Sequence, residues 1–300
     1  MSFERWLPLD DVPNAIRLRV NVGRDSTATA TWRVGDHEAE SFGTKRSVPP
    51  RGTSGRYNMT SKVAPLQSNI TTETPPTQGF LSTVLDAAGN VTFTGRMGDG
   101  EIVSGTSLWA TNGTVPLHRL LYKGVGGAVN GHLLITLPSI RPLVTSSGRL
   151  NWTKKPNAAD LILPAGWNPI ALDLSGGKYI VPTRLELLAA VLGTTPYLPE
   201  TMMVLSGGGL PEPLLSQLKP SLSSGFAFKR AVSTISNPKM SWRLKTGTIS
   251  GSCDVRTGHH VRFYSLDNQY EANSVGFCRV TQPNGTAQLG SVEIFRTPGL

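Results

Sequence analysis

Residues 79–135 form a ladder of short, alternating apolar runs separated by Gly-rich turns. The turns contain Gly89-Asn90, Asp99-Gly100 and Asn112-Gly113. Since Gly and Asn adopt positive φ angles at little cost, such pairs between strand-length runs are a strong signal for β-hairpins. We therefore predict an all-β protein, an antiparallel meander that forms a barrel or two barrel-like halves and carries one short helix.

The composition is that of a turn-rich β protein. Only 16% of the 300 residues are charged, whereas Gly and Pro contribute 32 and 22 residues. This composition favours a secreted or cell-surface protein, and we expect the chain to be a segment of a longer exported protein with flanking domains. A cytosolic location stays open, because the N-terminus lacks the basic start and apolar run of a signal peptide. No run approaches the length of a membrane helix, so we expect no membrane span.

The net charge of +9 is spread along the chain, and its only basic runs are pairs. A nucleic-acid-binding protein usually concentrates its charge on one stripe, so nucleic acid is a disfavoured partner. A polysaccharide or an anionic surface fits the charge equally well. The spacing of Cys253 and Cys278 predicts no metal site, and we expect no cofactor. In a simple meander these cysteines lie two strands apart, which favours free thiols, although a disulfide stays open.

Three segments follow from the pattern of apolar runs and turn residues. Residues 1–156 are predicted to form a first barrel-like half, with strands at 16–22, 27–34 and near 56–63 after an irregular start. Residues 157–225 hold Pro, Asn and Gly at many positions and are predicted to connect the halves. A capping Thr, strong helix formers and a terminal Gly predict a short helix at 183–193. Residues 226–300 are predicted to form a second β block that completes or repeats the barrel.

The chain also resembles a known family. The glycines and aromatics that carry the resemblance lie in residues 89–95 with Asp99 and Gly100, 116–126 with 131–135, and 150–156. These segments resemble a β-rich repeat module found toward the C-terminus of large exported proteins of environmental bacteria. His118 replaces an aromatic residue of that pattern, and Lys155 is inserted before Pro156. The resemblance implies export and membership of a multidomain surface protein, and it transfers no catalytic residue.

Acidic residues offer one candidate for chemistry, because glycoside hydrolysis uses a pair of carboxylates. The candidates are Asp99, Glu101 and Glu271, the last of which adjoins Tyr270, a possible sugar-stacking ring. The plainer interpretation is a turn-capping Asp and a solvated surface Glu. The sequence contains no nucleophile elbow, zinc-protease motif or phosphate-binding loop.

Aromatic residues offer a second candidate, because sugars stack on Trp and Tyr rings. The predicted binding residues are Trp109, His118, Tyr122, Trp152 and Trp167. Trp residues on alternating strands are more often part of a core than of an open surface. His118 and His132 lie on neighbouring predicted strands, but a metal would need a third ligand such as Asp99 or Glu101.

Three hypotheses result. The first is a non-enzymatic β module for display or for binding carbohydrate or surfaces, which predicts an exposed aromatic strip. The second is a hydrolase acting on glycans, with a carboxylate pair in a barrel mouth or interdomain groove. The third is a barrel that encloses an apolar ligand, which predicts a lumen without filling side chains.

Overall fold

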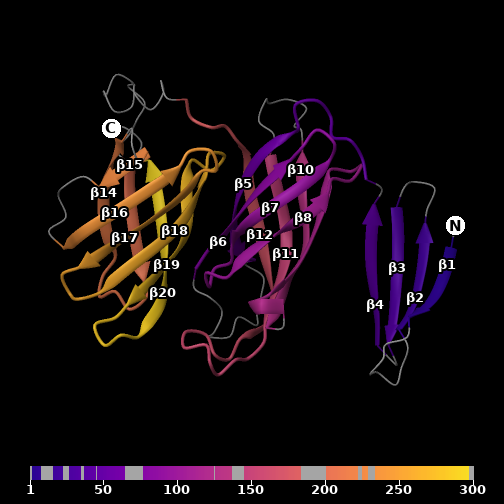
Figure 1. Ribbon diagram of the computed structural model, residues 1–300, viewed down its shortest axis with the longest axis horizontal. Helices are drawn as coiled ribbons and strands as arrows, with labels where there is room; N and C mark the ends of the chain where they lie inside the picture. Colours follow the sequence, from indigo (N-terminus) through magenta and orange to yellow (C-terminus); the bar gives the residue numbers. More distant parts are fainter. Residues whose placement is uncertain are drawn as a thin grey trace.

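The computed structural model describes residues 2–7, 16–22, 27–34, 37–44, 46–64, 77–124, 126–136, 145–183, 201–221, 225–228 and 234–296. Within these residues the chain is almost entirely antiparallel β structure in three sheets, as Figure 1 shows. The all-β prediction is therefore confirmed, including the two barrel-like parts. The helix predicted at 183–193 falls outside the described residues from 184 onward.

The N-terminal sheet has four strands in sequential order and lies beside the first barrel-like sheet (Figure 1). Its strands are β1 (Ser2–Leu7), β2 (Ile16–Val22), β3 (Thr27–Val34) and β4 (His37–Thr44). The predictions for 16–22 and 27–34 match β2 and β3. The irregular start that we expected is wrong in part, because β1 pairs with β2 along its whole length.

The second sheet, which we call barrel 1, contains eight strands in the order β8-β7-β6-β5-β12-β11-β10-β9. The two edge strands lie against each other, so the sheet is nearly closed, and the Ser107 hydroxyl donates to the Pro116 carbonyl between them. The strands are β5 (Gly55–Val63), β6 (Gly79–Leu85), β7 (Asn90–Arg96), β8 (Ile102–Leu108), β9 (Thr114–Leu121), β10 (Gly127–Thr136), β11 (Thr145–Lys154) and β12 (Trp167–Tyr179). A single turn of 3-10 helix, η1 (Tyr122–Gly124), links β9 to β10.

The third sheet, barrel 2, repeats this plan with eight strands in the order β15-β14-β13-β20-β19-β18-β17-β16. Its edge strands β15 and β16 are also in contact. The strands are β13 (Thr201–Gly207), β14 (Leu214–Ser221), β15 (Gly225–Phe228), β16 (Ile235–Arg243), β17 (Thr248–Val255), β18 (His260–Asn268), β19 (Asn273–Thr281) and β20 (Ala287–Arg296). In both barrels consecutive strands pair, except for the two edge strands, and the first strand pairs with the last.

The sheets divide the chain at other positions than the expected boundaries of 156 and 226. Strand β12 belongs to barrel 1, and β13 and β14 belong to barrel 2, although the sequence favoured a connection over 157–225. β12 contains Gly and Pro, which are typical of turns, so the sequence pattern did not predict a strand there. Pro169 lies within an irregularity of the pairing with β11, and Gly176 lies where a Cβ atom would be 2.0 Å from the Asn58 carbonyl oxygen.

Side chains fill the interior of barrel 1. Successive residues of β7 alternate between exposed and buried, so Val91 and Phe93 point inward, as the pleat of a strand requires. Phe93 lies across Gly105 of β8, where a Cβ atom would approach its ring to 2.6 Å. A gap among Leu81, Met97 and their neighbours has a volume of about 10 Å³. Such a gap holds at most one water molecule, so this lumen does not match the ligand-enclosing barrel.

The two barrels pack against each other through β5 and β6 on one side and β18 and β19 on the other. Buried Asn58 of β5 donates from Nδ2 to the carbonyl oxygens of Thr246 and Asp267, each at 3.0 Å. Its Oδ1 accepts a hydrogen bond from Ser82 at 2.8 Å. Within the described residues, no helix is long and apolar enough to cross a membrane.

Candidate functional site

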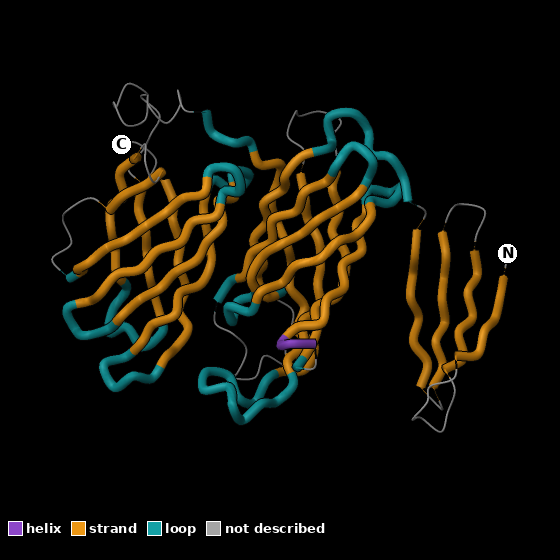
Figure 2. Tube along the Cα trace, viewed as in Figure 1, coloured by secondary structure: helices purple, strands orange, loops and turns teal. Residues whose placement is uncertain are grey.

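One end of barrel 1 gathers ionisable and aromatic side chains around a lysine, and we call this group the Lys154 cluster. Figure 2 shows η1 and the loop that joins β11 to β12 at this end. The cluster consists of Asp99 and Glu101 from the β7–β8 turn, Tyr122 from η1, Trp152 and Lys154 from β11, Asp160 from the β11–β12 loop, and Trp167 from β12.

Lys154 lies at the centre of the cluster. Its Nζ is 3.4 Å from Oδ2 of Asp99 and also contacts Oδ2 of Asp160. The side chains of Lys154 and Asp99 are only 5% and 4% exposed, and that of Asp160 is 25% exposed. The Lys154 ammonium also lies 4.9 Å from the ring centre of Tyr122 and 5.2 Å from that of Trp167. Two carboxylates and two aromatic faces thus replace most of the water around this amine.

Tyr122 connects the two turns of the cluster. Its hydroxyl donates to Oδ2 of Asp99 at 2.6 Å and accepts a hydrogen bond from Nε1 of Trp152 at 3.1 Å. Its backbone N–H donates to Oε1 of Glu101 at 2.9 Å. Burial, followed by the charge of Asp99, raises the pKa of Tyr122 far above its ordinary value, so the hydroxyl keeps its proton.

Backbone geometry fixes where these side chains lie. Tyr122 and Lys123 both adopt left-handed φ angles, of 52° and 62°, which non-glycine residues rarely adopt. In the β7–β8 turn, Oδ1 of Asp99 accepts from the Glu101 backbone N–H at 3.0 Å, which is the turn-capping role that the sequence indicated. The other oxygen, Oδ2, is left to face Tyr122 and Lys154.

Asp160 remains ionised in this environment. Its burial raises the pKa, but hydrogen bonds from Lys154 and from the backbone N–H groups of Ile162 and Leu163 outweigh burial and lower it below its ordinary value. The two backbone bonds, at 2.9 and 3.1 Å, both reach Oδ1. Oδ2 is therefore the oxygen that faces the lysine.

An open groove of about 740 Å³ lies next to the Lys154 cluster. Lys154 and Trp167 belong both to the cluster and to the lining of the groove. The lining combines apolar and polar side chains: Leu120, Gly127, Ala128, Thr153, Lys154, Lys155, Pro156, Ala165, Gly166, Trp167, Asn168 and Pro169. Among these, the exposed residues are Leu120, Lys155, Pro156, Ala165, Asn168 and Pro169.

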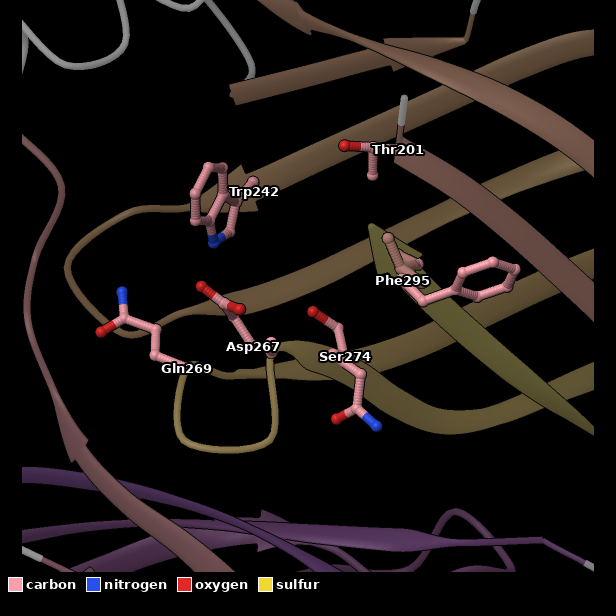
Figure 3. A pocket seen from close by; sticks show the side chains of 9 residues that line it. Thr201, Trp242, Asp267, Gln269, Ser274 and Phe295 are labelled. Atoms are coloured by element: carbon pink, nitrogen blue, oxygen red, sulfur yellow. The ribbon is translucent and has the colours of Figure 1, made fainter. Parts of the chain in front are cut away.

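A smaller pocket of about 230 Å³ lies in barrel 2 near the β18–β19 turn, as Figure 3 shows. Trp242, Asp267, Gln269 and Ser274 point toward it from different strands and from the turn. The side chain of Gln269 also makes two hydrogen bonds with the backbone of Ile180, at 2.9 and 2.8 Å, just after β12 of barrel 1. Asp267 is the single carboxylate in the lining.

The structure brings five of the eight sequence-predicted site residues together, since Asp99, Glu101, Tyr122, Trp152 and Trp167 all belong to the Lys154 cluster. The binding role predicted for the aromatics required an exposed strip. That part of the prediction is wrong for Trp152 and Trp167, which are buried with ring centres 4.5 Å apart in an edge-to-face contact.

The other three predicted residues lie elsewhere. Trp109 is buried in the core of barrel 1 at the end of β8. His118 is exposed on β9, opposite Asn130 of β10, whereas His132 pairs with Pro116. No group of three metal-ligating side chains occurs in the described part of the chain. Glu271, in the β18–β19 turn, lies 3.4 Å from the Thr60 hydroxyl of barrel 1.

Lys154 and Asp160 were not among the predicted site residues. Strand alternation did contain a signal for the lysine, because Leu150, Trp152 and Lys154 are spaced two apart and share the buried face of β11. A lysine in phase with a buried Leu and Trp needs a charge partner. The partner Asp160 lies in a loop of irregular pattern, where sequence spacing gives no position.

No protein-family model and no curated protein matches this chain. Among solved structures, a similar chain is that of a protein of unknown function from the DUF3598 family of Nostoc punctiforme. It is 10% identical, and the alignment covers 81% of this chain and 96% of that chain with a TM-score of 0.22. A score this low supports no inference about the function of this protein.

Proposed function

We propose that this chain is a non-enzymatic β module of a larger exported or cell-surface protein and that it binds carbohydrate. The groove beside the Lys154 cluster carries this proposal. Binding sites for small ligands and sugar chains combine apolar surface with a few polar groups that fix orientation. The groove offers Leu120, Pro156 and Pro169 as apolar surface, with Lys155 and Asn168 as exposed polar groups.

Charge favours an acidic polysaccharide over a neutral one. The chain carries a net charge of +9, which attracts polyanions at long range. At the groove itself, Lys155 is exposed, and no carboxylate belongs to the lining. A uronate or sulfate group on a sugar chain would therefore meet a cation without a competing acidic side chain in the lining.

The same lining argues for binding rather than hydrolysis. A glycosidase needs two carboxylates that face the substrate. In this chain Asp99 and Glu101 are engaged by Tyr122, and Asp99 also by Lys154. Glu271 does not line the groove and lies beside Thr60 at the contact between the barrels.

The test is binding of the purified chain to polygalacturonate and alginate, with a neutral β-glucan as comparison, measured by affinity electrophoresis at two salt concentrations. We expect retention by the acidic polymers that weakens with salt. Lys155→Ala should weaken it by up to about 5-fold, since one exposed charge contact contributes about 0.2–1 kcal/mol. The matched control Lys245→Ala removes an exposed lysine of barrel 2 and should leave retention nearly unchanged.

Two results would contradict this proposal. Equal weakening by both lysine substitutions would mean that net charge, and not the groove, holds the polymer. Release of reducing ends, abolished by Asp99→Asn or Glu271→Gln, would make the chain a glycan hydrolase instead.

A further inference from the structure

The Lys154 cluster contains every group needed for a covalent cross-link between side chains. Lys154 Nζ contacts Oδ2 of Asp160 on one side and lies 3.4 Å from Oδ2 of Asp99 on the other. The rings of Tyr122 and Trp167 enclose the amine. We propose that Lys154 and Asp160 condense in the folded protein to an isopeptide bond, with Asp99 as the catalytic carboxylate.

The reaction starts from the ion pair. Lys154 and Asp160 are at rest as ammonium and carboxylate, and condensation requires their neutral forms, amine and carboxylic acid. The Asp160 carboxylate must therefore take up the proton that Nζ gives up, against the hydrogen bonds that lower its pKa. The contact between Nζ and Oδ2 lets this proton pass directly, and little water reaches the Lys154 side chain, which is 5% exposed.

The bond changes balance without any further reagent. The neutral Nζ attacks Cγ of Asp160 and forms an N–C bond. The carbon–oxygen bond to one carboxyl oxygen then breaks, and this oxygen leaves as water with its own proton and one from the nitrogen. The products are one amide and one water molecule, and nothing is oxidised or reduced.

Asp99 is placed to move the proton. Its Oδ2 lies 3.4 Å from Nζ, so it can accept a proton from the attacking nitrogen and return it to the leaving oxygen. The Tyr122 hydroxyl donates to the same oxygen at 2.6 Å and holds Asp99 in this orientation. Since the reacting groups are already in contact, the entropic cost of bringing them together is met by the fold.

The cross-link is a modification independent of the proposed carbohydrate binding. It would close a short covalent ring at the start of the β11–β12 loop. Residues 156 and 165–166 of this loop line the groove, so the bond would fix one wall of it.

Mass spectrometry of the intact, purified wild-type chain tests the proposal directly. We expect a mass lower than that of the sequence by one water molecule. The tryptic map then locates the bond. An acylated Lys154 resists trypsin, and Lys155 precedes Pro156, so the linked chain yields one peptide of residues 150–178 that lacks one water. An unlinked chain yields peptides 150–154 and 155–178.

Three variants assign the roles. Lys154→Arg and Asp160→Ala should each show the full mass of their sequence, which is measurable even in a poorly folded protein. Asp99→Asn keeps the size of the side chain but removes the proton acceptor, and it should also show the full mass. The control Asp173→Asn removes an exposed carboxylate that pairs with Arg149, and it should still lack one water.

The proposal is overturned if the wild-type chain has the full sequence mass and releases peptides 150–154 and 155–178. It is also overturned if the missing water maps to Asp99-Gly100, since an Asp-Gly pair loses water by cyclising on its own backbone. Fragment ions that join Lys154 to Asp160 distinguish the two products.

Discussion

Replacing Tyr122 with Phe isolates the contribution of one hydroxyl to the Lys154 cluster. The substitution keeps the ring and the left-handed backbone, and it removes the donor to Asp99 and the acceptor of the Trp152 indole N–H. Asp99 then retains its contacts with Lys154 and the Glu101 backbone N–H. Trp152, which is buried, loses its hydrogen-bond partner.

The magnitude follows from these two losses. A hydrogen bond to a charged group contributes about 1.5–3 kcal/mol, and leaving a buried donor unpaired costs about 1–3 kcal/mol. The two share one hydroxyl and do not add fully, so we expect a loss of about 3 kcal/mol in the free energy of unfolding. That is a large fraction of the roughly 5–15 kcal/mol that a typical protein has.

Urea denaturation followed by far-ultraviolet circular dichroism measures this loss. The matched control is Tyr270→Phe, the same substitution at a ring that is 49% exposed. Surface changes of this kind usually stay within about 0.5 kcal/mol. If Tyr122→Phe also costs less than about 1 kcal/mol, the hydroxyl does not hold the cluster together and the reasoning from its two bonds fails.

Three further predictions concern barrel 2 and its contact with barrel 1. Asn58→Ala leaves two backbone carbonyls of barrel 2 without their donor and should cost about 2–3 kcal/mol in urea, whereas Asn151→Ala at an exposed site should cost almost nothing. Burial raises the pKa of Cys253 to about 11 and that of Cys278 to about 12, so Ellman's reagent at pH 8 should label both thiols only after unfolding. Because unfolded thiols ionise near pH 9.0, unfolding should become easier as the pH rises above that value. Rapid labelling of the native protein, or equal costs for the two Asn variants, would contradict these predictions.

The fold was largely predictable because its pairing is local. Several strands join the next through a turn that Gly or Asn marks, as at Asp99-Gly100, so the hairpin signal also indicated much of the order of strands in the sheet. The two free cysteines follow from the same order, since β18 separates Cys253 on β17 from Cys278 on β19. Strand β12 was missed because Gly176 serves a close backbone approach and Pro169 lies at an irregularity of the pairing, and neither marks a turn.

The site was less predictable because burial depends on which strand face meets the interior. The residue types of Trp152 and Trp167 suit sugar stacking, yet their positions place them inside barrel 1. The β7–β8 turn and η1 are separated by about twenty residues, and their contact depends on how the nearly closed sheet brings β8 beside β9. The spacing of residues in the sequence does not predict that the edge strands β8 and β9 meet.

Lys154 also bears on whether the carboxylates near it can act in hydrolysis. Lys154 lies between Asp99 and Asp160 and forms an ion pair with each carboxylate. The Tyr122 hydroxyl also donates a hydrogen bond to Asp99. A general acid for glycoside cleavage must instead be protonated and face a substrate oxygen. If the isopeptide bond forms, Asp160 no longer has a carboxyl group, and Asp99 stays buried behind the cross-linked loop. The mass of the intact chain therefore distinguishes a cross-linking role of this cluster from a hydrolytic one before any substrate is known.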